Sequence, residues 1–122
     1  MPRILIVEDD ENLRALLKSA LSSEGHEVTE AADGGAALKH LAQTPADLVV
    51  TDMLMPGKEG VETIVEIRRN LPQTKIIAIS GGLRGSKFDI LRMAEKVGAH
   101  RSMAKPFSMG EIIQAVADLL AR

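Results

Sequence analysis

Acidic, hydroxyl and amino side chains directly follow the apolar stretches of this sequence. Four of them are carboxylates, one is a hydroxyl and one is an ammonium: Glu8, Asp9, Asp10, Asp52, Ser80 and Lys105. Carboxylates that gather closely repel one another and resist ionisation unless a cation lies among them. Magnesium is a hard divalent ion that tolerates a site of few carboxylates completed by water and phosphate oxygens. These residue types therefore indicate a magnesium site that acts on a phosphoryl group.

Each kind of side chain has a chemical role in such a site. Asp52 could attack phosphorus as the nucleophile, as in enzymes that form an aspartyl phosphate. Phosphoryl transfer depends on positioning and on neutralising charge more than on covalent assistance. Lys105 could neutralise one phosphoryl oxygen, and the Ser80 hydroxyl could donate a hydrogen bond to another. The set predicts phosphoryl transfer to Asp52.

Short apolar runs alternate with amphipathic stretches along the whole chain. The runs predict strands at 4–7, 26–31, 48–51, 75–80 and 102–104. The amphipathic stretches predict helices around 13–21, 37–41, 61–71, 88–97 and 112–120. Asp10 and Asp33 are interpreted as caps of the first two helices. Breaker residues between 53 and 60 and glycines between 81 and 85 predict loops.

This alternation predicts an α/β fold in which helices cover both faces of a parallel sheet. Five strand–helix units fit the flavodoxin-like, doubly wound (βα)5 class, whose five-stranded parallel sheet has the strand order 2-1-3-4-5. That order belongs to the fold class and is not deduced from individual residues. Ligands in such folds bind outside the carboxyl ends of the strands, between the first and third strands. The polar side chains after the strands are therefore expected to meet there.

Composition narrows the possible functions. A chain of 122 residues predicts one domain, residues 1–122. The formal net charge of −2 argues against a surface built mainly to bind nucleic acid directly. The absence of cysteine excludes disulfides and thiolate chemistry and fits a cytoplasmic protein. No apolar run has the length of a membrane span, so no membrane partner is expected.

Four segments of the sequence resemble the receiver domain of two-component response regulators. They are residues 4–10 (ILIVEDD), 47–56 (DLVVTDMLMP) with Gly60, 76–81 (IIAISG), and Gly98-Ala99 before Lys105-Pro106-Phe107. Each segment by itself is weak evidence for the family, but together the segments occur in the family's order and at the expected strand ends. The resemblance covers essentially the whole chain.

The resemblance implies a role for each site residue. Asp52 would be the phosphorylation site, with Glu8 and Asp9 as the acidic pair. The metal site would comprise Glu8, Asp9, Asp52 and the backbone carbonyl of Leu54, with Mg2+ as the ion. Ser80 would supply the switch hydroxyl and Lys105 the lysine of the family. The Lys105-Pro106 bond would be cis.

The resemblance also implies what the chain does. It would be a phospho-acceptor signalling domain, not an enzyme that turns over external substrates, and would assist its own phosphorylation and dephosphorylation. A histidine kinase or phosphotransfer protein would donate the phosphoryl group, and phosphorylation would switch the interaction with a downstream protein target. The sequence leaves open whether the domain stands alone or belongs to a larger protein.

Other interpretations of the same residues exist. Asp9 could cap the first helix, Asp52 could start a turn, and Ser80 and Lys105 could be ordinary surface residues.

The chain could also have another function. A flavin-binding fold would need a phosphate-binding loop after the first strand, but Glu8, Asp9 and Asp10 stand there and would repel the phosphate. A phosphatase of the haloacid dehalogenase type expects a second acid where Leu54 stands. A degenerate receiver that only docks would normally lack the nucleophile or the lysine. The joint placement of these side chains favours the phospho-acceptor.

The sequence departs from the family pattern in two places. Ser102 stands where many members carry an aromatic residue that swings inward on activation. The stretch between Ser80 and Lys105 is a few residues longer, and the extra length falls at 81–86. Its three glycines permit backbone conformations closed to other residues. We therefore expect residues 81–86 and the start of the fourth helix to change order on phosphorylation; the alternative interpretation is a flexible surface loop with no role in the switch.

Phospho-Asp52 is predicted to hydrolyse slowly for this family. A polar side chain that orients the attacking water would accelerate hydrolysis, but the two best-placed positions are the apolar Leu54 and the side-chain-free Gly82. The double variant Leu54→Asn, Gly82→Glu should therefore lose its phosphoryl group faster than the parent, as followed by decay of the phosphorylated mass. A double variant that keeps its phosphoryl group as long as the parent would show that water access sets the rate.

Overall fold

The computed structural model describes residues 1–53, 60–81 and 87–121, and the side chains of residues 87–90 are not described. The strands are β1 (Arg3–Val7), β2 (Glu27–Ala31), β3 (Leu48–Asp52), β4 (Lys75–Ser80) and β5 (Arg101–Ala104). The helices are α1 (Glu11–Ser23), α2 (Gly34–Gln43), α3 (Gly60–Asn70), α4 (Lys87–Val97) and α5 (Met109–Leu120). All strand pairs are parallel, and the order is β2-β1-β3-β4-β5. The predicted fold class and strand order are confirmed.

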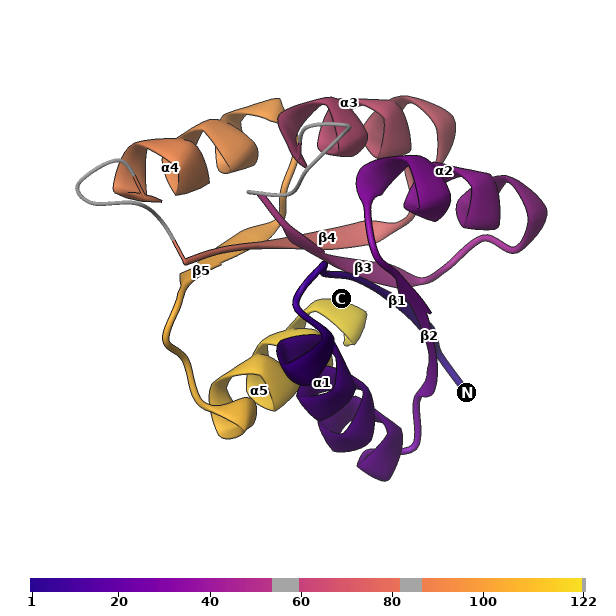
Figure 1. Ribbon diagram of the computed structural model, residues 1–122. Helices are drawn as coiled ribbons and strands as arrows, with labels where there is room; N and C mark the ends of the chain where they lie inside the picture. The colour runs from indigo at the N-terminus through magenta and orange to yellow at the C-terminus, as the bar shows by residue number, and fades with distance from the viewer. Residues whose placement is uncertain (54–59, 82–86, 122) are drawn as a thin grey trace.

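Helices cover both faces of the sheet, as Figure 1 shows: α2, α3 and α4 lie on one face, and α1 and α5 lie on the other. Each layer has its own buried core. Leu5, Val49 and Ile76 point toward the first layer and pack in one apolar cluster with residues of α2, α3 and α4. Ile6 and Val50, on alternate positions, pack in a second cluster with residues of α1 and α5. Burial on both faces explains why β1, β3 and β4 are nearly continuous apolar runs instead of alternating ones.

Local signals in the sequence determine where the helices begin. The side chain of Asp10 accepts hydrogen bonds from the backbone N–H groups of Asn12 and Leu13, and Asp33 accepts one from Ala36. These bonds satisfy donors that the first turn of a helix leaves without partners. Both predicted caps are confirmed. The structure adds a reciprocal capping box between Ser108 and Glu111 at the start of α5.

β1, β3 and β5 are each one residue longer than predicted, β4 has the predicted bounds, and β2 begins one residue later. β1 begins at Arg3, which is in register with Glu27 of β2, and β3 runs one residue further, to Asp52. Pairing between parallel strands uses backbone groups, so it continues past the last apolar side chain. Asp52 is consequently held in the sheet, in register with Ile79 of β4. The nucleophile predicted from the sequence lies on a strand end and not in a loop.

The carboxyl ends of the strands meet at one edge of the sheet. Val7 is in register with Thr51, Asp52 with Ile79, and Ser80 with Ala104. The residues that follow β1 and β5 therefore lie at the same edge as Asp52. The Lys105-Pro106 bond is cis, as the resemblance implied. No helix in the described part of the chain is long and apolar enough to span a membrane.

Gly60→Ala is predicted to destabilise the protein. A Cβ atom on Gly60 would lie 2.7 Å from the Cα atom of Met53, a backbone atom that cannot move without shifting the end of β3. Overpacking of this kind costs about 1–3 kcal/mol. Gly35→Ala is the matched control, because its Cβ would meet only the Asp33 Oδ1 atom at 3.4 Å, and alanine favours a helix by about 1 kcal/mol over glycine.

Urea unfolding, followed by far-UV circular dichroism, measures the free energy of unfolding of each variant and of the parent. We expect a lower midpoint for Gly60→Ala and an equal or higher midpoint for Gly35→Ala. Equal midpoints for Gly60→Ala and the parent would contradict the close approach of α3 to the end of β3.

Candidate functional site

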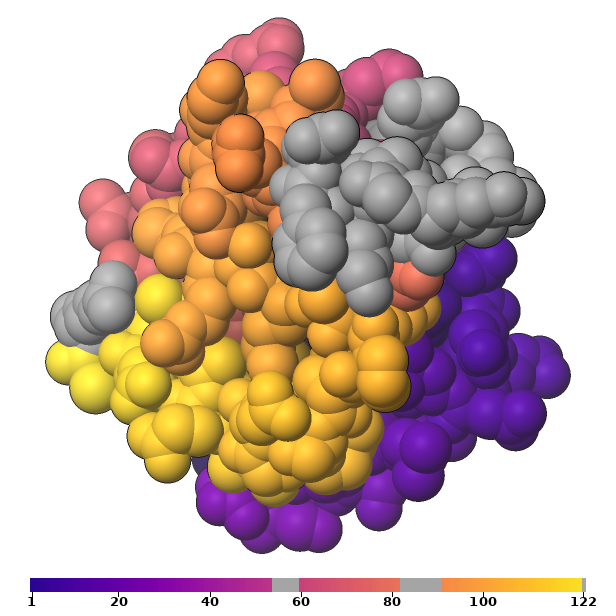
Figure 2. All heavy atoms as spheres, turned by 90° about the vertical axis from the view of Figure 1, so that its left-hand side faces the viewer, coloured from indigo at the N-terminus to yellow at the C-terminus, as the bar shows by residue number. Residues whose placement is uncertain are grey.

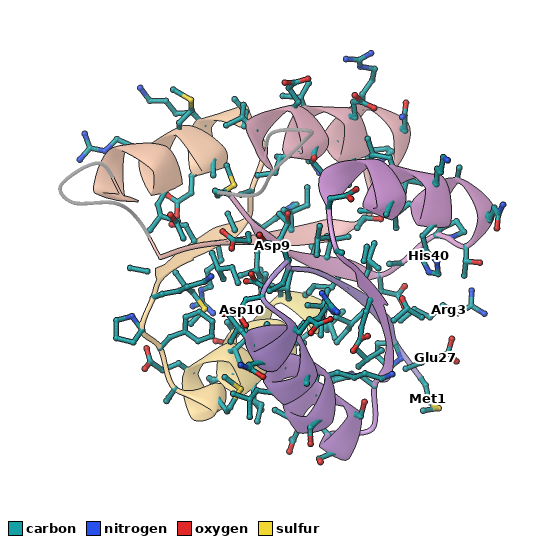
Figure 3. All side chains as sticks on the ribbon, in the orientation of Figure 1. Met1, Arg3, Asp9, Asp10, Glu27 and His40 are labelled. Atoms are coloured by element: carbon teal, nitrogen blue, oxygen red, sulfur yellow. The ribbon has the colours of Figure 1, made fainter. Side chains whose placement is uncertain are left out.

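Three carboxylates gather at the carboxyl edge of the sheet. Glu8 and Asp9 follow β1, Asp52 ends β3, and one carboxylate oxygen from each residue lies within 4.8 Å of the others. Glu8 and Asp52 are almost fully buried, with 0% and 3% of their surface exposed, whereas Asp9 is exposed. In Figure 3, Asp9 lies near the start of α1, while Arg3 lies at the beginning of β1, the other end of that strand. The predicted acidic pair and the predicted nucleophile are brought together.

Lys105 bridges two members of this cluster. Its Nζ atom lies 3.1 Å from Oε1 of Glu8 and 3.0 Å from Oδ2 of Asp52. The lysine side chain is 24% exposed, so both bonds are partly shielded from water. Charge-assisted hydrogen bonds of this length are stronger than neutral ones. The ammonium of Lys105 therefore partly compensates the repulsion between Glu8 and Asp52.

The pKa values of Glu8 and Lys105 report the balance of charge. Burial raises the pKa of the Glu8 carboxyl to about 7 from 4.5, and the negative charge of Asp52 adds to this rise. The Asp10 backbone N–H and the Lys105 ammonium oppose it. Burial alone would lower the pKa of Lys105, but its contacts with Asp52 and then with Glu8 raise it above its ordinary value. Burial is thus the main reason that the Glu8 carboxyl resists ionisation, and the charge of Asp52 adds to that resistance.

A divalent cation fits this arrangement. Glu8, Asp9 and Asp52 offer only oxygen ligands, and their summed charge exceeds that of Lys105. Hard cations such as Mg2+ prefer carboxylate oxygens and complete their shell with water. The exposed Asp9 leaves one side of the cluster open to solvent. Leu54, whose carbonyl the resemblance implies as a further ligand, lies outside the described residues.

Ser80 occupies the position predicted for the switch hydroxyl. It ends β4, is fully buried, and is one strand away from Asp52 in the sheet. The backbone carbonyl of Ser80 accepts a hydrogen bond of 2.9 Å from the backbone N–H of Lys105. Ser80 and Lys105 are therefore linked through the backbone. Gly82 and the rest of 82–86, where the sequence predicts a change of order, lie outside the described residues.

Two members of the acidic segment have separate roles. The side chain of Asp10 caps α1, as predicted, and its backbone N–H donates a 3.1 Å hydrogen bond to Oε2 of Glu8. Arg14 was not recognised from the sequence. Its Nη1 atom donates a 2.8 Å hydrogen bond to the backbone carbonyl of Glu8. A basic residue near a helix N-terminus is unfavourable for the helix dipole, and that is the signal that could have identified Arg14.

Ser102, which replaces the expected aromatic residue, has a partner on α4. Its hydroxyl lies 2.5 Å from Oε2 of Glu95 and donates a hydrogen bond to it. Figure 2 looks onto this side of the molecule and shows α4 and α5 with the chain that joins them. The small side chain therefore ties β5 to α4 through a polar contact instead of filling an inward pocket.

A family model for the response regulator receiver domain matches residues 4–117. The chain belongs to this family. Membership identifies it as a signalling domain of two-component systems.

Curated relatives of this receiver domain are transcriptional regulatory proteins. CpxR of Klebsiella pneumoniae subsp. pneumoniae (strain HS11286) is 37% identical over 122 residues, which are 100% of this chain and 50% of that protein. RprY of Bacteroides fragilis (strain YCH46) is 37% identical over 120 residues, which are 98% of this chain and 50% of that protein. The receiver domain thus spans about half the length of the curated relatives it matches.

Solved receiver domains have the same architecture. The receiver domain of NtrX from Brucella abortus matches with a TM-score of 0.89 and 30% identity, covering 97% of this chain and 98% of that one. TrrA from Thermotoga maritima, solved in complex with Mg2+ and BeF, matches with a TM-score of 0.85 and 35% identity, covering 98% of this chain and 99% of that one. These likenesses agree with the fold described above.

Glu8 is predicted to make the stability of the metal-free protein depend on pH. Because its pKa is about 7 in the folded protein and 4.5 ordinarily, the folded state binds more protons than the unfolded chain between these values. The free energy of unfolding should therefore fall as pH rises through this window. Glu8→Gln keeps the size and an acceptor oxygen but does not titrate, so this fall should become smaller.

Urea unfolding in EDTA across this pH range provides the measurement. Glu27→Gln is the control, because Glu27 is an exposed carboxylate in an ion pair with Arg3. It should keep the parental pH dependence. The same slope in Glu8→Gln as in the parent would assign the dependence to other groups.

Proposed function

We propose that Asp52 accepts a phosphoryl group from a histidine kinase or a phosphotransfer protein in a Mg2+-dependent reaction. The observation that carries the proposal is the position of the Asp52 carboxylate, 3.0 Å from the Lys105 ammonium and within the cluster of Glu8 and Asp9. A carboxylate held beside an ammonium and a cation site is suited to attack on phosphorus.

Each residue has a defined part in this reaction. An oxygen of Asp52 forms the new bond to phosphorus while the bond from phosphorus to the donor breaks, and the donor leaves with the electron pair. Lys105 neutralises charge on the transferred group, and Ser80 donates a hydrogen bond to it. Glu8, Asp9, Asp52 and the carbonyl of Leu54 would hold Mg2+, which supplies neutralising charge. The same groups support hydrolysis of the acyl phosphate by water.

The domain acts as a switch because the product carries more charge than Asp52 alone. The acyl phosphate carries about two negative charges where the Asp52 carboxylate carries one, and its phosphoryl group offers three acceptor oxygens. Lys105, whose ammonium contacts both Glu8 and Asp52, gains a stronger partner. The resulting rearrangement alters the interaction with a downstream protein target. The transcriptional regulatory relatives suggest that this target lies in transcription control.

We assign residues 1–122 to one receiver domain, which binds no nucleic acid directly.

Phosphorylation is predicted at Asp52 alone. Incubation with a small phosphodonor and Mg2+ should add one phosphoryl mass to the parent, and EDTA should prevent the addition. Asp52→Asn should remain unmodified because its amide is a far weaker nucleophile than the carboxylate. Intact-mass spectrometry follows both proteins.

Asp10→Asn is the matched control for this experiment. It removes a carboxylate two positions after Glu8, but asparagine caps a helix as well as aspartate does. We expect Asp10→Asn to be phosphorylated like the parent. Modification of Asp52→Asn at the parental rate would refute the assignment. A parent that binds a histidine kinase but takes up no phosphoryl group would instead be a docking module.

A further inference from the structure

Arg14 contacts the acidic segment from the first turns of α1. Its Nη1 atom donates a 2.8 Å hydrogen bond to the backbone carbonyl of Glu8, and its Nε atom lies 3.8 Å from Oε2 of Glu30 on β2. The side chain of Arg14 is only 18% exposed, and that of Glu30 is 32% exposed. The guanidinium thus links the end of β1 with α1 and β2.

The bond to the Glu8 carbonyl fixes the direction of Asp9. That carbonyl belongs to the planar peptide unit that joins Glu8 to Asp9, so holding its oxygen also orients the Asp9 N–H and Cα. The other side of Glu8 is held as well, because its backbone N–H donates a 3.0 Å hydrogen bond to the carbonyl of Ala31. Together these bonds hold the backbone on both sides of Glu8.

Asp9 depends on this backbone support more than its neighbours do. Lys105 holds the carboxylates of Glu8 and Asp52 directly. Within the described ranges, no hydrogen bond or ion pair holds the exposed carboxylate of Asp9. Its placement within 4.8 Å of the other two ligand oxygens is therefore determined mainly by the path of its backbone.

We propose that Arg14 is a positioning residue of the cation site. By holding the peptide between Glu8 and Asp9 it aims the Asp9 carboxylate into the cluster, and Glu30 in turn holds the guanidinium. The inference rests on the proposed function, because it assigns Arg14 a role in the binding of the Mg2+ on which phosphorylation depends. Arg14 touches none of the three cluster carboxylates, so its effect passes through the backbone.

Calorimetric titration with MgCl2 tests this role, and it suits a chain with no Trp and no Tyr to report binding by fluorescence. Arg14→Met keeps an apolar stem but removes every donor. Residues that orient metal ligands typically change the affinity about 10–100-fold, so its dissociation constant for Mg2+ should rise at least about tenfold. Arg14→Lys should restore part of the affinity, since an ammonium can still donate to the carbonyl. Glu30→Gln should weaken binding less than Arg14→Met.

Arg101→Met is the matched control. Arg101 is another partly buried arginine in an ion pair, 3.4 Å from Asp118, but it begins β5 and so lies at the opposite end of the strands from the cluster. The Arg101→Met variant should bind Mg2+ with parental affinity even if it unfolds at a lower urea concentration. Urea unfolding in EDTA and in excess Mg2+ separates general destabilisation from loss of binding, because only a weaker affinity reduces the stabilisation that Mg2+ provides.

The outcomes distinguish this inference from the proposed function. Parental affinity in Arg14→Met, or an equal loss of affinity in Arg101→Met, would overturn the role of Arg14 while leaving the proposed function intact. If Arg14→Met does not fold, parental affinity in both Arg14→Lys and Glu30→Gln would overturn it equally. A parent that neither binds Mg2+ nor becomes phosphorylated would refute the proposed function, and the inference with it.

Discussion

The ammonium of Lys105 holds two buried carboxylates that would otherwise repel each other, and much of the structure serves this contact. Glu8 and Asp52 have 0% and 3% of their surface exposed, and burying an unpaired charge is costly. The Lys105 ammonium lies 3.1 Å from Glu8 and 3.0 Å from Asp52 and offsets part of this cost for both carboxylates. The three residues come from the ends of β1, β3 and β5. Their contact therefore requires these strands to end together at one edge.

The doubly wound sheet satisfies this requirement. Parallel strands all end on the same side, and the order β2-β1-β3-β4-β5 makes β1 and β3 neighbours although a helix, a strand and another helix separate them in the sequence. The two apolar layers then hold the strands from both faces. Gly60 adds a local constraint, since the start of α3 approaches the backbone of Met53 too closely for any side chain. The site is consequently built on rigid strand ends.

One lysine does not neutralise three carboxylates. The remaining negative charge suits the site to bind a cation. Burial, and after it the negative charge of Asp52, raises the pKa of Glu8 to about 7, so this buried carboxyl resists ionisation. A bound cation would relieve that resistance, and a phosphoryl group on Asp52 would take over part of the lysine's charge. In the proposed function, the negative charge that Lys105 leaves uncompensated favours the binding of Mg2+. The competition for the Lys105 ammonium then drives the switch.

The sequence by itself determined the elements and the members of the site. Apolar runs and helical periodicity are local properties, so all five strands and five helices were predicted, with the caps Asp10 and Asp33. The position of the site could be predicted because parallel strands bring their carboxyl ends to one edge of the sheet, whatever the details of packing. Boundaries shifted by a few residues: β3 continued to Asp52 through backbone pairing, and α1 and α2 extended beyond their apolar positions.

Only the tertiary structure decided how these side chains are held. The burial of Glu8 and the shared ammonium of Lys105 depend on distances between separate strands. The bond from Arg14 to a backbone carbonyl and the bond from Ser102 to Glu95 join different elements, and no periodicity encodes them. A pattern of residue types indicates which face a side chain occupies, but its partner is determined by how the elements pack against one another.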